Sequence, residues 1–297
     1  MDGLNYGEQA GDIMAMTSFT WYCGADLPGE VMTAALEAYQ FEPHFHDAWS
    51  IGAIASGSCT FSYQGATHVA RQGDLVVIPP LAVHTGGSSD APLAYSMAYL
   101  QASWFDAHAS MTHGASVRFP DVVISDEPLC RRWAAALTRD DLDEAARKRD
   151  ISAALFELLA RHAAMAKDVG SAPGPVDASS ELQASFNEHD LPKADVTALA
   201  QRWGMHRTTL SKQFARRYGL PPDRWLRNWR AVKAKRLIAD GMPLADVAAA
   251  TGFADQAHLT RVFKRIHGAP PGALQRSPDR HATDVPSPRA ACAKTKG

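Results

Sequence analysis

Three histidines in the N-terminal half have the spacing of a ligand or metal site. His44 and His46 are two residues apart in the segment PHFHD, and His84 comes four residues after the pair Pro79-Pro80. Alternate residues of a β-strand share one face, so His44 and His46 would lie together on an extended segment. Neutral imidazoles bind Zn²⁺ and similar borderline metals. We therefore predict that His44 and His46 lie together, either to hold a divalent metal or to present polar groups to an organic ligand.

The elements that must position these histidines are predicted to be short strands. The clearest cover residues 49–55, 58–63, 75–78 and 93–100, and turn-forming Gly and Pro residues separate them. Many short strands without intervening helices indicate a sandwich or barrel. In residues 93–100 the apolar side chains alternate, which predicts a strand with one buried face.

The two histidine segments resemble the two motifs of cupin barrels, namely His-x-His on one strand and Gly-(x)5-Pro followed by a histidine. In metal-binding cupins the histidines of both motifs point into the barrel and hold one ion, so the resemblance implies that His84 joins His44 and His46. Metal cupins usually carry a glutamate shortly after His-x-His, whereas Trp49, Ser50 and Ile51 occupy that stretch here. Two interpretations therefore stay open: a metal bound by His44, His46 and His84, or a metal-free polar pocket.

Residues 131–165 are predicted to form two antiparallel helices. Apolar residues recur there at helical spacing, with a charged break over residues 139–150. Such helices would pack on the barrel, join a second copy of the chain, or do both.

Charge divides the chain into two parts, although the formal net charge is only −2. Residues 1–180 hold 10 Lys and Arg against 22 Asp and Glu, whereas residues 181–276 hold 16 against 8. This asymmetry favours a nucleic-acid-binding module attached to another domain. The sequence has no apolar run long enough to span a membrane, no secretory signal pattern and no CxxC pair. We therefore expect a cytoplasmic protein without a membrane partner.

Residues 195–219, DVTALAQRWGMHRTTLSKQFARRYG, have the pattern of a helix-turn-helix. Asp195 is predicted to cap a helix over residues 196–203, and Gly204 suits the tight turn that follows. A second helix is expected to begin near His206. Its apolar face recurs every fourth residue, at Leu210, Phe214 and Tyr218, and its polar face is left for DNA.

The same pattern recurs in residues 244–268, LADVAAATGFADQAHLTRVFKRIHG. Ala248 and Gly252 repeat Ala200 and Gly204 at an offset of 48, and each repeat ends in Gly-x-Pro-Pro. Residues 223–239 between the repeats are predicted to form a helix that fixes their separation. Two such units in tandem are a far more specific signal than one.

Residues 181–276 resemble the DNA-binding domain of the AraC/XylS family of transcription regulators. Besides the repeats, Arg230, Ala234 and Leu237 of the connecting helix and Gly252-Phe253 carry the resemblance, while Leu274 stands where an aromatic residue is commoner. The barrel and helices before it resemble the effector-binding and dimerisation domain of many members.

The resulting expectation is an α+β chain: a cupin-like β-barrel with a helical hairpin, then an all-α domain with two helix-turn-helix motifs. The predicted bounds are 1–167 for the effector-binding and dimerisation domain, 168–180 for a linker, 181–276 for the DNA-binding domain and 277–297 for a disordered tail.

The resemblance implies that two recognition helices enter successive major-groove segments, about 34 Å apart on one face of DNA. We expect Arg207 and Arg261 to bind base edges, because arginine suits guanine O6 and N7. Others of the set are expected to bind only phosphate. The residues carried over by position are Arg207, Thr208, Ser211, Lys212, Gln256, His258, Thr260 and Arg261.

The leading functional hypothesis is a ligand-responsive transcription regulator, an activator on family grounds, that forms a homodimer and acts with RNA polymerase. Its small-molecule effector is expected to contact His44, His46, Trp49, Tyr63 and His84. Two alternatives stay open. One is a metal-dependent cupin enzyme with a DNA-binding appendage, and the other is a constitutive regulator whose closed barrel serves only dimerisation.

Overall fold

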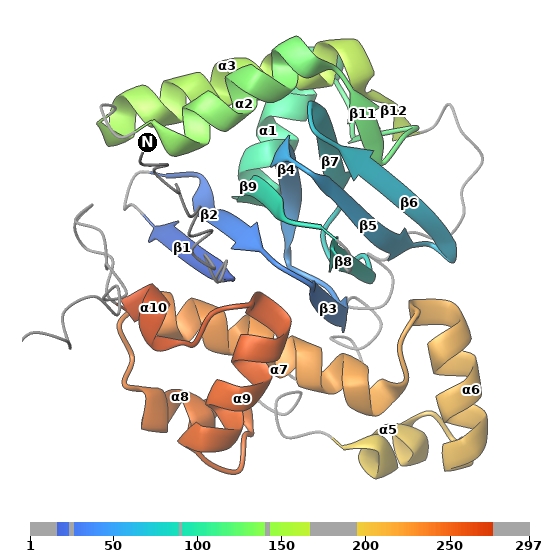
Figure 1. Ribbon diagram of the computed structural model, residues 1–297. Coiled ribbons are helices and arrows are strands. Elements are labelled where there is room, and N and C mark those ends of the chain that lie inside the picture. The colour runs from blue at the N-terminus through green and yellow to red at the C-terminus, as the bar shows by residue number, and fades with distance from the viewer. Residues whose placement is uncertain (1–16, 24–26, 89–90, 140–142, 167–194, 276–297) are drawn as a thin grey trace, which may run out of the picture.

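A computed structural model of the chain describes residues 17–23, 27–88, 91–139, 143–166 and 195–275 (Figure 1). These residues form a β-rich N-terminal domain, drawn in blue and green, and a helical C-terminal domain, drawn in yellow to red. The predicted mixed fold is confirmed. The predicted linker and tail, and the first residues of the predicted second domain, lie outside the described residues, so the domain bounds stay predictions.

The N-terminal domain is built on two antiparallel sheets. A six-stranded sheet has the order β1-β2-β9-β4-β7-β11 and a four-stranded sheet has the order β3-β8-β5-β6, while β10 and β12 pair separately. The strands are β1 (Ser18–Cys23), β2 (Gly29–Leu36), β3 (Tyr39–His44), β4 (Ala48–Ser56), β5 (Ser58–Tyr63), β6 (Ala66–Arg71), β7 (Asp74–Ile78), β8 (His84–Ser88), β9 (Leu93–Gln101), β10 (Val117–Arg118), β11 (Val123–Ser125) and β12 (Ala164–Met165).

Both faces of the six-stranded sheet are buried, which corrects the prediction of a single buried face for residues 93–100. Three helices, α1 (Ala102–His113), α2 (Glu127–Thr138) and α3 (Glu144–His162), cover its outer face (Figure 1). Ala98 and Leu100 pack in the cluster under these helices, whereas Leu93 and Tyr99 pack on the inner side. The two faces of β9 do differ, but its second face packs against helices instead of facing solvent. The predicted helix pair is α2 and α3, and α1 was not predicted.

The C-terminal domain consists of two helix-turn-helix units joined by the long helix α7 (Figure 1). The first unit packs at one end of α7 and the second at the other end. The helices are α5 (Val196–Arg202), α6 (Arg207–Tyr218), α7 (Pro222–Ala239), α8 (Leu244–Thr251), α9 (Gln256–His267) and the short α10 (Gly272–Gln275).

Side-chain caps and a glycine explain why these helices begin and end where they do. The carboxylate of Asp195 accepts a hydrogen bond from the Ala198 amide at 2.7 Å, and Asp255 accepts one from His258 at 2.6 Å. Each satisfies a backbone donor that the helix itself leaves unpaired. Gly252 ends α8 with φ of +76°, a backbone conformation that other residues rarely adopt. The turn of the second unit therefore depends on glycine.

The two domains pack against each other along the barrel wall formed by β3 and β1. One continuous apolar cluster contains Trp21 and Phe41 of the barrel together with Ile238 and Phe263 of the helical domain. Phe45 follows β3, is fully buried and packs among the core residues of the first helix-turn-helix, with its ring 5.2 Å from that of Trp225. The interface is thus a shared hydrophobic core.

Candidate nucleic-acid interface and barrel cavity

The outer face of α6 is polar because its apolar residues are all turned inward. Leu210, Phe214 and Tyr218 are buried in the cluster that holds the first unit together. Arg207, Thr208 and Lys212 are exposed, and Ser211 is half-buried. His206 precedes the helix, and its Nδ1 lies 2.9 Å from the Thr208 hydroxyl, which fixes the first turn.

The outer face of α9 is built in the same way. Gln256 and Arg261 are exposed, whereas His258 and Thr260 are half-buried. The Thr260 hydroxyl donates to the Gln256 carbonyl at 2.8 Å, and the His258 ring stands edge-on to Phe253 at 5.3 Å. Both predicted recognition helices therefore present arginine at the surface, with smaller polar side chains beside it.

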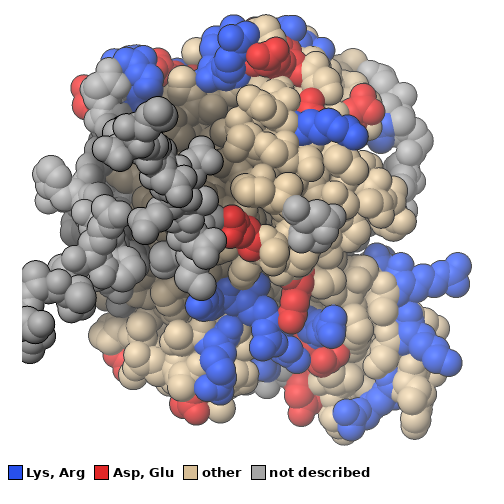
Figure 2. All heavy atoms as spheres, in the orientation of Figure 1, with Lys and Arg blue, Asp and Glu red and all other residues tan. Residues whose placement is uncertain are grey.

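Figure 2 shows Lys and Arg side chains gathered over the helical C-terminal domain, in the lower part of the view. This agrees with the excess of basic residues in residues 181–276. A basic surface next to exposed polar helix faces is the electrostatic pattern of a protein that binds the phosphate backbone.

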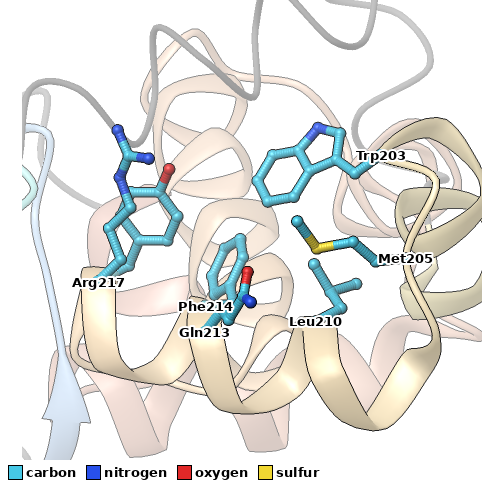
Figure 3. Close-up of a pocket in the computed structure, with 7 residues that line it drawn as sticks. Trp203, Met205, Leu210, Gln213, Phe214 and Arg217 are labelled. Carbon is cyan, nitrogen blue, oxygen red and sulfur yellow. The ribbon is translucent and has the colours of Figure 1, made fainter.

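A pocket of about 360 Å³ opens beside α6 (Figure 3). Trp203, Met205 and Leu210 point toward one another there, and Gln213 and Arg217 add polar groups to the lining. The full lining is Trp203, Met205, Leu210, Gln213, Phe214, Arg217 and Tyr218. Apolar packing of the first helix-turn-helix accounts for most of this lining, so the better candidate for a specific ligand site is the cavity of the barrel.

The structure brings the three predicted histidines together inside the barrel. Their candidate ligand nitrogens all lie within 4.8 Å of one another, and all three residues are buried. The ring centroids of His44 and His84 are 4.4 Å apart, and those of His44 and His46 are 4.9 Å apart. His44 faces His84 across the β3–β8 pair, whereas His46 lies just beyond the end of β3.

Backbone carbonyls fix the tautomers of two of these rings. His44 Nδ1 lies 2.7 Å from the Glu42 carbonyl and His84 Nδ1 lies 2.9 Å from the Ala82 carbonyl. A carbonyl only accepts, so each Nδ1 carries the proton and each Nε2 keeps a free lone pair. A carbonyl hydrogen-bonded to Nδ1 in this way orients a histidine ring so that its Nε2 can bind a metal.

Burial keeps the imidazoles neutral. It lowers the pKa of His44 to about 3, with the nearby His84 contributing, and the pKa of His84 to about 4. Burial also holds the pKa of His46 well below its ordinary value, with smaller contributions from His44, His84 and Lys235. Neutral nitrogens with free lone pairs fit Zn²⁺ or a similar ion, or an organic group that donates a hydrogen bond.

The cavity above the histidines has a volume of only about 60 Å³. Most of its wall is apolar, with Phe41, Ile54 and Phe61 among the lining residues. One wall residue, Ile266, belongs to α9 of the C-terminal domain. The second predicted recognition helix therefore closes the barrel.

Two of the predicted effector contacts do not line this cavity. Trp49 packs on the outer face of the sheet, with its ring stacked on Phe105 at 4.0 Å. Its neighbour Ser50 lines the cavity instead, because adjacent strand residues point to opposite faces. Tyr63 sits opposite His84 in the β5–β8 pair, is half-buried against the apolar cluster that contains Phe41 and Phe61, and accepts a hydrogen bond from Gln64 through its hydroxyl. Trp49 therefore lies on the other face of the sheet from the histidines, and the effector-binding set stays a prediction.

Sequence reasoning missed the contribution of the C-terminal domain to the cavity. Ile266 and His267 end α9, and His267 stands where the first repeat has Tyr218. Tyr218 packs in the core of its own unit, whereas the His267 ring lies 5.8 Å from that of His46 in the barrel. The exchange of tyrosine for histidine between the repeats was the available signal.

Two family models match the chain. The AraC-like ligand binding domain matches residues 28–159, and the helix-turn-helix domain matches residues 199–277. The chain belongs to the AraC family of transcription regulators. An AraC-family protein of this type binds DNA through its C-terminal domain and has an N-terminal ligand-binding domain, as the geometry above indicates.

Named relatives of this AraC-family chain are also regulators. It is 26% identical over 250 residues to the HTH-type transcriptional regulator YbfI of Bacillus subtilis, covering 75% of this chain and 86% of that protein. It is 31% identical over 91 residues to the virulence regulon transcriptional activator VirF of Yersinia enterocolitica, covering 30% of this chain and 34% of that protein. The alignment with the arabinose operon regulatory protein of Escherichia coli has 32% identity over 92 residues and spans 31% of this chain and 32% of that protein.

A solved structure shares the fold across both domains. ToxT from Vibrio cholerae, crystallised with an unsaturated fatty acid, superposes with a TM-score of 0.52 over 86% of this chain and 92% of its own. The sequences are 13% identical, so this likeness shows the fold alone. None of the helices in the described part of the chain is long and apolar enough to cross a bilayer.

Proposed function

We propose that this regulator binds two successive major-groove segments through α6 and α9, and that an effector in the barrel cavity controls that binding. The observation that carries the control step is the segment His44-Phe45-His46. Its two histidines point into the cavity, while Phe45 between them is buried in the core of the first helix-turn-helix. Movement of this segment therefore changes packing in both domains.

The second helix-turn-helix is coupled to the cavity in a different way. Ile266 of α9 is part of the cavity wall, and about 60 Å³ is far below the roughly 300–1,000 Å³ of a typical small-molecule pocket. An organic effector would have to enlarge the cavity, and an outward shift of α9 is the direct way to do so. A ligand that prefers the enlarged state would then change the placement of α9 on DNA.

The DNA-binding step is tested by selecting duplexes that bind the full-length protein from a random pool, and then footprinting the protein on the selected duplexes. We expect two protected major-groove segments on one face, about 34 Å apart. Protection of a single segment, or no sequence preference, would overturn the two-helix proposal. A thermal-shift screen then tests control: an effector should raise Tm and change DNA affinity. A ligand-free regulator, the constitutive alternative, gains support if no small molecule does both.

We further propose that the protein is an activator that works as a homodimer with RNA polymerase in the cytoplasm. Met111 of α1 is 66% exposed and Phe156 of α3 is 36% exposed, so the helical side of the N-terminal domain carries apolar surface. Light scattering should give the mass of two chains, and Met111→Glu should lower it. In a reporter assay the protein should raise transcription from its operator, and repression would contradict the activator assignment.

The enzyme alternative fits the cavity less well than control by binding. The described residues of the histidine cluster include no carboxylate to act as acid or base, and the small cavity leaves little space for a substrate beside an ion. Purified protein with bound metal should therefore turn over no substrate in screens for isomerase and dioxygenase activity, and turnover that is lost in His44→Ala would reverse this conclusion.

A further inference from the structure

A fourth histidine, from the DNA-binding domain, lies beside the three of the barrel. His267 is the last residue of α9, is 2% exposed, and its ring centroid is 5.8 Å from that of His46. Its ring interacts with the Ala231 carbonyl, but neither ring nitrogen has a hydrogen-bond partner within normal geometry. A buried imidazole without such partners is costly, and coordination of an ion is one of the usual reasons for it.

The geometry points to a divalent metal site that spans the two domains, with His44, His46 and His84 from the barrel and His267 from α9 as ligands. This inference rests on the proposed role of the barrel cavity as the control site. It adds that the bound ion would tie the second recognition helix to the barrel.

The ring positions fit a four-coordinate ion. With Zn–N distances of about 2.0–2.1 Å, two imidazoles on one tetrahedral ion place their ring centroids about 5 Å apart. The observed separations are 4.4 Å, 4.9 Å, 5.4 Å and 5.8 Å for the pairs His44–His84, His44–His46, His46–His84 and His46–His267. His267 is not among the residues whose candidate ligand nitrogens lie within 4.8 Å of one another, so binding one ion through all four requires α9 to move toward the barrel.

The electrostatic surroundings allow an ion here. All four histidines have a lowered pKa, chiefly through burial, so no proton competes with a metal at neutral pH. The charge of Lys235 acts on both His267 and His46, but its ammonium is paired with the Glu30 carboxylate. That pairing reduces the repulsion that a divalent ion would meet.

The two ligand types have opposite consequences for DNA binding. An ion held by His267 favours the closed arrangement, with α9 against the barrel. An organic effector that enlarges the cavity favours α9 away from it. The ion and the effector would therefore compete, because they favour opposite positions of α9 at the same wall of the cavity.

The test uses full-length protein stripped of metal with a chelator and titrated with Co²⁺, then with Zn²⁺. We expect one Co²⁺ per chain, with the intense visible absorption of a tetrahedral site, and displacement by Zn²⁺. His267→Ala should weaken Co²⁺ binding about 10-fold or more and change the spectrum. His258→Ala, on the same helix but outside the cluster, is the matched control and should bind like the wild type.

A second measurement keeps the outcome clear if a variant folds poorly. Saturating Zn²⁺ should raise the Tm of the wild type and raise that of His267→Gln much less, because only the wild type gains a bond between the domains. Unchanged Co²⁺ affinity and spectrum in His267→Ala, with loss in His44→Ala, would place the ion in the barrel alone and overturn the two-domain site. Absence of Co²⁺ and Zn²⁺ binding by the wild type would overturn it as well, while the DNA footprint would still decide the proposed function separately.

Discussion

Lys235 of α7 and Glu30 of β2 form an ion pair across the interface between the two domains. The Lys235 ammonium also lies over the rings of Trp21 and Tyr99, at 4.4 Å and 4.5 Å from their centroids. Lys235 itself is 7% exposed. A charge from the DNA-binding domain is thus enclosed by the barrel, and the domain contact is specific as well as apolar.

Lys235→Met should destabilise the protein by about 3–5 kcal/mol, because it leaves the Glu30 carboxylate largely buried without its partner. Urea denaturation of the full chain measures the change. The double variant Lys235→Met/Glu30→Leu should recover most of it. Arg265→Met is the matched control, since Arg265 and Glu42 are both more than half exposed at a separation of 3.5 Å, and an exposed pair contributes less than about 1 kcal/mol. Equal effects of the two single variants would contradict the enclosed pair.

Trp49→Ala should cost about 3–5 kcal/mol, as expected for removal of a large buried aromatic side chain. Trp49 stacks on Phe105 in the cluster between the sheet and its helices, on the far side of the sheet from the histidines. Co²⁺ binding by the folded variant should be unchanged. Weakened metal or effector binding at constant stability would show that Trp49 contributes to the cavity after all.

Arg261→Ala should cost roughly 1–3 kcal/mol at the selected DNA site and relax the preference at one base pair. Arg261 is exposed on α9, and arginine pairs with guanine through two hydrogen bonds. Fluorescence anisotropy on cognate and single-mismatch duplexes measures both effects, and Arg207→Ala should relax a position in the other half of the site. Equal losses on cognate and random DNA would assign Arg261 to phosphate.

DNA affinity should fall steeply with salt, because each phosphate contact releases condensed counterions. With about 6–10 such contacts, affinity would drop about 10³- to 10⁵-fold between 50 and 200 mM salt. Binding isotherms at several salt concentrations give the slope of log affinity against log salt concentration. Lys212→Ala should reduce the magnitude of this slope by about 1, the contribution of one phosphate contact. A flat dependence would argue against the basic surface of Figure 2 as the interface.

The free energy of unfolding of the metal-free protein should decrease as the pH falls below about 6.5. Burial lowers the pKa of His44 to about 3 and that of His84 to about 4, so at intermediate pH the unfolded chain binds more protons than the folded chain. Stability then rises with pH, by roughly 1.4 kcal/mol per pH unit for each such histidine. Urea denaturation between pH 5 and 7.5 measures the slope. His84→Gln should reduce it, and an unchanged slope would show that His84 is not buried in the neutral form.

The sequence by itself determined the two helix-turn-helix units and the shared face of His44 and His46. Local signals were sufficient there: Asp195 caps its helix, Gly252 provides the turn, and apolar residues at every fourth position define the buried face of α6. Likewise, a two-residue spacing is enough to place His44 and His46 on one side of a short extended segment. These features depend on residues that are close in the chain.

Only the tertiary structure decided which side of the sheet is the cavity and what closes it. Alternation separates Trp49 from Ser50, but nothing local says which of the two faces is covered by helices and which holds the histidines. The approach of Ile266 and His267 to the barrel is a contact between residues more than 200 positions apart, so periodicity and capping carry no information about it. The physical reason is that packing of one domain on another is set by the shape and charge of whole surfaces, here the apolar cluster around Trp21 and the pairing of Lys235 with Glu30.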